Sequence, residues 1–258
     1  MTTYLEDILE RKRREVRALD VDLGALTERV TRCRTEVLPR LRTPGRLSVI
    51  AEHKRRSPSR GALAAQSDAA AVGAAYSAAG AAAISVLTDG EGFGGSPDDL
   101  RQVKAAVDVP VLCKDFIVSP LQVLLAREWG ADLVLLIVAA LSPAELARLH
   151  ALAESLGMTP LVEVHDAHEL TVAANVGARL IGVNTRNLHT FEVDLGLAER
   201  LAARFPSGAV RVAESGIRTA ADARRMRDAG YHAILVGEQF MATGDPGRAL
   251  AAMLAEVG

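Results

Sequence analysis

The feature that most constrains the fold is a repeated alternation of short apolar runs with longer helical stretches, which begins at residue 47. Several runs are apolar at both alternating sets of positions, as expected of parallel strands buried on both faces. The stretches between them are rich in Ala, Leu, Arg and Glu, which favour helix. Eight such runs occur, at residues 47–54, 81–89, 109–116, 131–138, 159–165, 179–186, 209–216 and 232–238.

The segment "SPAELARLHALAESLG" (142–157) illustrates the helical stretches. Pro143 suits the first turn of a helix, and Gly157 suits a C-terminal cap. Gly-Ala or Ala-Gly pairs precede or open several of the apolar runs, which fits a helix stop followed by a tight turn into a strand. Each unit therefore reads as a strand followed by a helix.

Eight strand–helix units in about 210 residues predict an α/β fold, a (β/α)8 TIM barrel. A doubly wound open sheet is the alternative, but it usually carries a Gly-rich dinucleotide loop after its first strand. Here the first run ends in "EHKRRSPS", which is no such loop. With no linker or change of composition, we expect one domain over 1–258. The barrel would span 47–258, and 1–46 would form a helical extension covering it.

Composition excludes several other classes of protein. The 258 residues are 49% hydrophobic and 24% charged, with a net charge of −2, which argues against a generic binder of nucleic acid. We interpret the basic run "RKRRE" (11–15) as the solvated face of a helix. Cys33 and Cys113 form no disulfide framework. With no signal peptide, and no apolar run near the roughly 20 residues of a membrane helix, we expect a cytoplasmic protein.

Polar residues collect where the predicted strands end. Glu52 and Lys54 are two positions apart, so both side chains point to one face of the first strand. In a barrel, the C-terminal ends of the strands meet at one mouth, where catalytic groups lie. Six of the eight strands contribute to the predicted ring: Glu52, Lys54, Lys114, Phe116, Glu163, Asn184, Arg186, Glu214, Ser215, Gly216, Gly237 and Glu238.

Such a ring suits general acid–base chemistry on an anion. Lysines and glutamates that are packed together shift one another's pKa values, and inward charges need one another or a charged substrate as partners. Ser215, Gly216 and Gly237 leave amide groups accessible after strands seven and eight, the frequent phosphate site of this fold. A metal site at His165 and His168 is disfavoured, because "HDAHEL" reads as a helix start with Asp166 as its cap.

These segments, taken in order, resemble the indole-3-glycerol phosphate synthase family of tryptophan biosynthesis. The resemblance runs from about residue 4 to the C-terminus. It rests on eight ordered motifs: "IAEHKRRSPS", "ISVLTD…FGGS", "CKDFIV", "GADLVLLIV", "LVEVHD", "IGVNTRNL…FEVDL", "VAESGI" and "ILVGEQFM".

The resemblance implies an enzyme, a TIM-barrel carboxy-lyase that closes an indole ring without a cofactor or metal. Lys114 would be the general acid at the substrate ketone, with Lys54 as the competitor for that role, and Glu163 would act in the dehydration. Glu52, Lys54, Asn184, Arg186 and Glu214 would hold the carboxylate and the hydroxyls. The aromatic pocket would be lined by Ser57, Phe93, Phe116, Leu135 and Leu188, and the phosphate would be held by Ser215, Gly216, Gly237 and the amide of Glu238.

Four further expectations remain open at this stage. His53 should point away from Glu52, into the helix layer, and Arg55 and Arg56 should be solvated or steer the anionic substrate. The partner should be a phosphorylated small molecule, with neither nucleic acid nor membrane involved, and the chain should be a monomer or a weak homodimer. The alternatives are another phosphosugar barrel, such as phosphoribosylanthranilate isomerase or a Schiff-base aldolase, and a non-catalytic barrel that binds a phosphorylated ligand or an enzyme.

Overall fold

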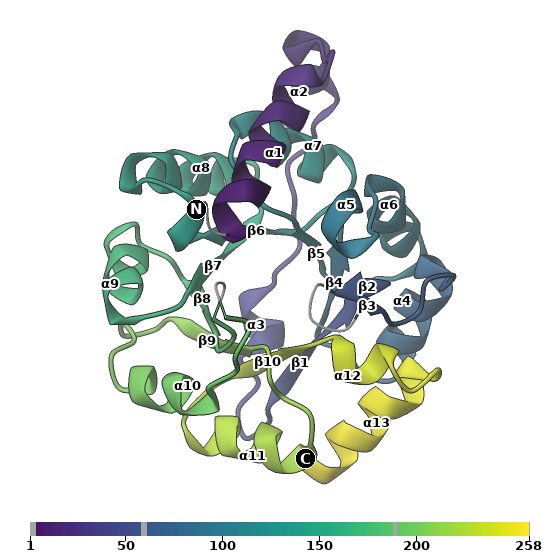
Figure 1. Ribbon diagram of the computed structural model, residues 1–258, viewed down its shortest axis with the longest axis vertical. Coiled ribbons are helices and arrows are strands. Elements are labelled where there is room, and N and C mark those ends of the chain that lie inside the picture. Colours follow the sequence, from purple (N-terminus) through teal and green to yellow (C-terminus); the bar gives the residue numbers. More distant parts are fainter. Residues whose placement is uncertain (1–3, 58–60, 188–189, 258) are drawn as a thin grey trace.

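Eight parallel strands close into a barrel in the order β1-β10-β9-β8-β7-β6-β5-β4 (Figure 1). This computed structural model describes residues 4–57, 61–187 and 190–257. The eight strands predicted from the sequence are confirmed, and most are shorter at both ends than the apolar runs that mark them. Their bounds are β1 (Ser48–His53), β4 (Ala83–Leu87), β5 (Val111–Lys114), β6 (Leu133–Ile137), β7 (Thr159–Val164), β8 (Leu180–Asn184), β9 (Val210–Glu214) and β10 (Ala233–Val236).

A layer of helices surrounds the barrel (Figure 1). Local signals set their ends. Pro143 is the first residue of α8, and Ser142 and Glu145 form a reciprocal capping box there. Asp166 caps α9 by accepting from the Glu169 amide at 2.8 Å, as predicted. The bounds are α4 (Ala69–Ala78), α6 (Pro97–Ala106), α7 (Pro120–Glu128), α8 (Pro143–Ser155), α9 (Ala167–Asn175), α10 (Leu195–Ala202), α11 (Ala220–Asp228) and α13 (Pro246–Val257).

Short elements decorate the loops that follow the strands. Two short strands pair antiparallel in the loop after β1. A one-turn helix follows β4, a 3-10 turn follows β6 and another one-turn helix follows β10. Their bounds are β2 (Arg56–Ser57), β3 (Gly61–Ala62), α5 (Gly90–Phe93), η1 (Val138–Ala140) and α12 (Glu238–Met241).

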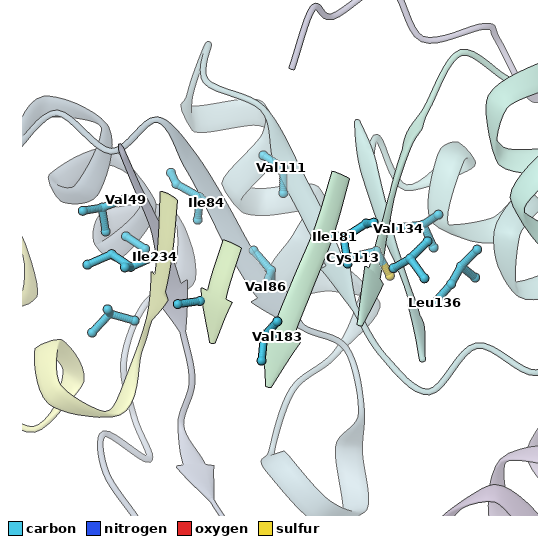
Figure 2. Packing of buried hydrophobic residues seen from close by; sticks show 14 of the residues in the cluster. Val49, Ile84, Val86, Val111, Cys113, Val134, Leu136, Ile181, Val183 and Ile234 are labelled. Carbon is cyan, nitrogen blue, oxygen red and sulfur yellow. The ribbon is translucent and has the colours of Figure 1, made fainter. Parts of the chain in front are cut away.

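The core has two layers because successive residues of a strand face opposite sides. Val49 belongs to the layer between strands and helices, with Ile84, Val134 and others in Figure 2. Its neighbour Ile50 belongs to the barrel interior. His53 lies on the outer layer as predicted, with Nε2 3.0 Å from Ser67 Oγ. Burial, together with Arg55, lowers the pKa of His53 to about 4, so its ring is neutral at pH 7.

Three helices precede the barrel: α1 (Tyr4–Ala18), α2 (Leu23–Arg29) and α3 (Leu38–Leu41). Leu5 and Leu9 of α1 and Leu41 of α3 join the interior cluster. Ser48, at the start of β1, donates to the Arg40 carbonyl of α3 at 3.1 Å. The segment therefore contributes to both ends of the barrel, with α3 at the N-terminal ends of the strands. Among the residues described, no helix combines the length and the apolar character needed to cross a membrane.

The basic run of α1 is not simply a solvated face, so that interpretation was wrong in part. Lys12 is 5% exposed. Its Nζ lies 2.6 Å from Asp89 and 2.9 Å from Asp115, while Arg11 also pairs with Asp89. Lys12 follows Leu5, Ile8 and Leu9 at helical spacing, so the face that packs on the barrel also carries this ammonium to the two carboxylates. Arg13 and Arg14 are exposed.

Arg55 also departs from expectation. Its guanidinium pairs with the buried Asp99 at the start of α6, and it donates to the Ser67 carbonyl at 3.0 Å. Arg55 is thus fixed to the barrel wall and does not stand free to steer a substrate. Arg56 donates to the carbonyl groups of Gly90 and Glu91, which ties the loop after β1 to α5.

Replacing Asp132 with alanine should destabilise the fold without changing any group that lines the cavity described below. Asp132 is 1% exposed, just before β6. It accepts from Thr35 Oγ1 at 2.7 Å, from the Val111 amide at 2.9 Å and from Lys104 Nζ at 2.7 Å. Removing a paired buried carboxylate leaves these donors without a partner, so we expect a loss of about 3–5 kcal/mol in the free energy of unfolding. Urea unfolding measures this loss. A variant as stable as the wild type would show that these contacts contribute nothing.

Candidate active site

One cavity at the C-terminal mouth of the barrel collects the residues that the sequence placed at strand ends. Leu188 lies outside the described residues. The remaining fifteen line the cavity together: Glu52, Lys54, Ser57, Phe93, Lys114, Phe116, Leu135, Glu163, Asn184, Arg186, Glu214, Ser215, Gly216, Gly237 and Glu238.

Lys114 is the centre of the charged part of the cavity. It is the last residue of β5, and its Nζ lies 3.0 Å from Glu163 Oε2 and 2.8 Å from Glu214 Oε2. Burial by itself would lower the pKa of Lys114, but the carboxylates of Glu163, Glu214 and Glu52 raise it above the ordinary value. The side chain is therefore a protonated amine held between two acids.

The two acids differ in what else they contact. Glu163 Oε1 accepts from Asn184 Nδ2 at 3.1 Å, and burial is outweighed by Lys114, His165 and Asn184, so the pKa of Glu163 is lowered. Glu214 Oε1 is buried and has no hydrogen-bond partner among the described residues. Burial, with the charge of Glu163, raises the pKa of Glu214 to about 7 despite Lys114. One site thus holds an ionised carboxylate and a carboxyl that titrates near neutral pH.

A second lysine–glutamate pair lies at the C-terminal end of β1, with Glu52 in the strand and Lys54 just after it. Lys54 Nζ lies 2.5 Å from Glu52 Oε1, and Ser85 donates to Glu52 Oε2 at 3.3 Å. Glu52 is 1% exposed. A Cβ at Gly237 would lie only 2.7 Å from Glu52 Oε1, so the glycine after β10 leaves the room that this carboxylate occupies.

The turn after β9 has unusual backbone geometry. Ser215 has φ 67° and Gly216 has φ 72°, so two consecutive residues are left-handed. This is unfavourable for serine by about 1–2 kcal/mol. Thr185 Oγ1 donates to the Ser215 carbonyl at 3.1 Å and helps to hold the turn. Successive backbone amides in a turn can form a concavity that binds an anion.

Aromatic and aliphatic side chains form the remaining wall. The rings of Phe93 and Phe116 are 6.1 Å apart. Sequence analysis expected residues 1–46 to cover the barrel but named no lining residue there. Tyr4 of α1 lines the cavity and packs edge-on against Phe191 at 5.1 Å. Other lining residues that sequence analysis missed are Leu5, Ile8, Leu87, Asp115, Ile137, Ile217, Arg218, Leu235, Val236 and Gln239.

Gly182 was also missed, although a glycine inside an apolar strand is a usable signal. It lies in β8 opposite Glu163, and a Cβ there would overlap Glu214 Oε1. Only glycine leaves space for the Glu214 carboxyl to reach Lys114.

The histidines near β7 do not form a metal site. His165 contacts Glu163 and Glu169, whereas His168 is exposed on α9. Within the described ranges, no group of three or more His, Cys, Asp or Glu side chains is placed to hold a metal ion.

The Glu214→Gln change should remove part of the pH dependence of the free energy of unfolding. In the native state this carboxyl titrates near 7, above its ordinary value of 4.5. The native state therefore holds a proton that the unfolded chain has released, and wild-type stability falls as the pH rises from about 4.5 to 7. Glutamine lacks this titration, so its stability relative to wild type should improve by about 3 kcal/mol across that window.

Urea unfolding at pH 5, 6, 7 and 8 measures this trend. The exposed Glu199 provides a control, because Glu199→Gln should show no such improvement above pH 5. A difference between Glu214→Gln and wild type that stays constant with pH would rule out the raised pKa.

Comparison with known proteins gives a consistent result. The family model for indole-3-glycerol phosphate synthase matches residues 5–253. The chain is 54% identical to the indole-3-glycerol phosphate synthase of Parafrankia sp. over 246 residues, which cover 94% of this chain and 91% of that protein. The enzyme of that name from Mycobacteroides abscessus is 50% identical over 253 residues, covering 96% and 93%.

A solved structure shares the fold. The N-acetylmannosamine-6-phosphate 2-epimerase from Clostridium perfringens superposes with a TM-score of 0.62 over 86% of this chain and 98% of its own. The sequence identity is 15%, so this likeness concerns the barrel architecture alone.

Proposed function

This chain belongs to the indole-3-glycerol phosphate synthase family, and we propose that its cavity closes the indole ring by lysine–glutamate acid–base catalysis. The substrate is 1-(2-carboxyphenylamino)-1-deoxyribulose 5-phosphate. The products are indole-3-glycerol phosphate, carbon dioxide and water. The observation that carries the proposed mechanism is the ammonium of Lys114 between the buried carboxyl groups of Glu163 and Glu214.

In this proposal, Lys114 is the general acid of the ring closure. As the aromatic carbon attacks the ketone, negative charge develops on the ketone oxygen, and a nearby ammonium both stabilises that charge and donates a proton. Lys54 is the alternative donor, because its ammonium also lines the cavity. Ring and ketone belong to one molecule, so holding them in a reactive geometry contributes much of the rate, up to roughly 7–11 kcal/mol.

Glu163 acts in the later dehydration. Aromatisation of the indole requires removal of a proton and loss of a hydroxyl as water. A carboxylate that is ionised at neutral pH can accept this proton. Once protonated, the same group can donate to the departing hydroxyl, which then leaves as water. The lowered pKa of Glu163 supports this assignment, because the group starts the cycle without its proton.

The remaining residues hold the ends of the substrate. Backbone amides of Ser215, Gly216, Gly237 and Glu238 bind the phosphate at the turns after β9 and β10. Glu52, Lys54, Asn184, Arg186 and Glu214 hold the carboxylate and the sugar hydroxyls. Ser57, Phe93, Phe116 and Leu135 surround the aromatic ring. Arg186 supports Glu238, with 3.7 Å between their charged groups.

The same proposal makes the enzyme cytoplasmic and independent of a cofactor or metal. Its substrate carries a phosphate and a carboxylate, which do not cross a bilayer unaided. We also propose that the chain is a monomer, with a weak homodimer as the alternative.

The test is an indole-forming assay on purified protein with substrate and EDTA, and no nucleotide. We expect indole absorbance and fluorescence to appear. A lysine adduct trapped by borohydride would indicate an aldolase instead. Calorimetric binding of the substrate without turnover would indicate a non-catalytic barrel.

A further inference from the structure

His165 follows Glu163 by two positions, just after the end of β7. The two side chains therefore lie on the same side of this strand. Its backbone amide donates to Glu169 Oε2 at 2.7 Å, and its Nδ1 lies 3.2 Å from the same oxygen. A carboxylate oxygen can only accept, so Nδ1 carries a proton. Glu169 belongs to α9, whose first turn thereby holds the ring in place.

The other ring nitrogen faces the reactive carboxylate. Nε2 lies 3.4 Å from Glu163 Oε1. This nitrogen is buried and makes no aligned hydrogen bond within the described part of the chain. A neutral ring would place a lone pair of Nε2 close to this carboxylate oxygen, which is unfavourable. An imidazolium instead places a positive charge there, and the contact is then an ion pair without an aligned hydrogen bond.

We propose that His165 is a positioning residue which, as an imidazolium held by Glu169, orients the Glu163 carboxylate and stabilises its ionised form. This inference rests on the proposed function, in which Glu163 accepts a proton.

The charges around Glu163 explain why a second cation is needed. Lys114 contacts Oε2 and Asn184 contacts Oε1. Once Lys114 has given its proton to the ketone, it no longer balances the charge of Glu163. His165 is then the cation that remains beside this carboxylate and keeps it ready to accept a proton.

The groups that face His165 from other elements support the charged ring. They are Glu163 on β7, Glu169 on α9 and Glu214 on β9. Lys114 of β5 contacts the other carboxylate oxygen of Glu163, Oε2. Burial lowers the pKa of His165, but the hydrogen bond to Glu169 and the carboxylates of Glu163 and Glu214 outweigh it, so the pKa is raised.

The test compares His165→Ala and His165→Gln with wild type by following kcat and KM against pH. Without the imidazolium, the pKa of Glu163 rises, so the acid limb of the kcat profile should move to higher pH by about one unit in both variants. We expect kcat at pH 7 to fall about 10- to 100-fold in His165→Ala, less in His165→Gln, with KM within about twofold. Added imidazole should restore part of the activity of His165→Ala.

His168→Ala is the matched control, because His168 is exposed three positions further on and its loss should leave the profile unchanged. Glu169→Gln, which weakens the support behind the ring, should move the acid limb in the same direction even if the His165 variants fold poorly. An acid limb that stays at the wild-type pH in Glu169→Gln and in every His165 variant that folds would overturn the inference. Absence of indole formation in wild type and His168→Ala would instead overturn the proposed function and, with it, this role.

Discussion

Replacing Lys114 with alanine should lower kcat for indole formation by about 10³-fold or more while the barrel stays folded. The variant loses the proton donor for the ketone and the positive charge that stabilises the developing oxyanion. Lys54 lines the same cavity, but it is paired with Glu52 at 2.5 Å and so cannot take the place of Lys114 without breaking that pair. Steady-state and single-turnover fluorescence assays measure the loss.

The loss must be separated from a general effect on stability. Without Lys114, two buried carboxyl groups face each other, so we expect the native state to take up a proton. The double variant Lys114→Ala/Glu214→Gln removes this repulsion and should recover stability without recovering kcat. Lys104, which pairs with Asp132 at 2.7 Å, provides the control, because Lys104→Ala removes a lysine–carboxylate pair outside the cavity. Turnover of Lys114→Ala within tenfold of wild type would remove Lys114 from the mechanism.

Replacing Glu163 with glutamine should lower kcat by about 10²- to 10³-fold, through a different step. Glutamine keeps the shape and an acceptor for Asn184, but it cannot take the proton released on aromatisation. Lys114 retains Glu214 as its partner, so ring closure and decarboxylation should continue. A single turnover should therefore release carbon dioxide faster than the indole chromophore appears.

Parallel measurement of carbon dioxide and indole absorbance tests this separation. The surface change Glu199→Gln should leave both rates at the wild-type value, because Glu199 pairs with Arg225 outside the cavity. If both products of Glu163→Gln appear together at a reduced rate, Glu163 acts before or during ring closure and its assigned role is wrong.

Much of the fold was predictable because the signals are local and repeated. A strand that is buried on both faces leaves an apolar run, and helix ends leave residues such as Ser142, Pro143 and Gly157. Those signals require no knowledge of distant contacts. The same logic located Glu52, Lys54, Lys114, Glu163 and Glu214, because a residue at the end of a parallel strand reaches the mouth wherever the barrel closes.

The errors have a common physical cause. Lys12 was assigned to a solvated helix face, and Arg55 was expected to be solvated or to steer the substrate. In the structure, Lys12 pairs with Asp89 and Asp115, and Arg55 pairs with Asp99. Such pairs join elements that are far apart in the chain, and composition does not encode the angle at which a helix docks. The contribution of Tyr4 to the cavity was missed for the same reason.

The sequence by itself determined which side chains point into the mouth of the barrel, since the two-residue period of a strand fixes the face of each residue. Only the tertiary structure decided which of those groups hold a proton near neutral pH. It left Glu214 Oε1 without a hydrogen bond from any residue that the structure describes, and it placed Asn184 and His165 beside Glu163. Two glutamates of the same intrinsic acidity thereby acquire pKa values displaced in opposite directions, because acidity depends on burial and on neighbours that only folding brings together.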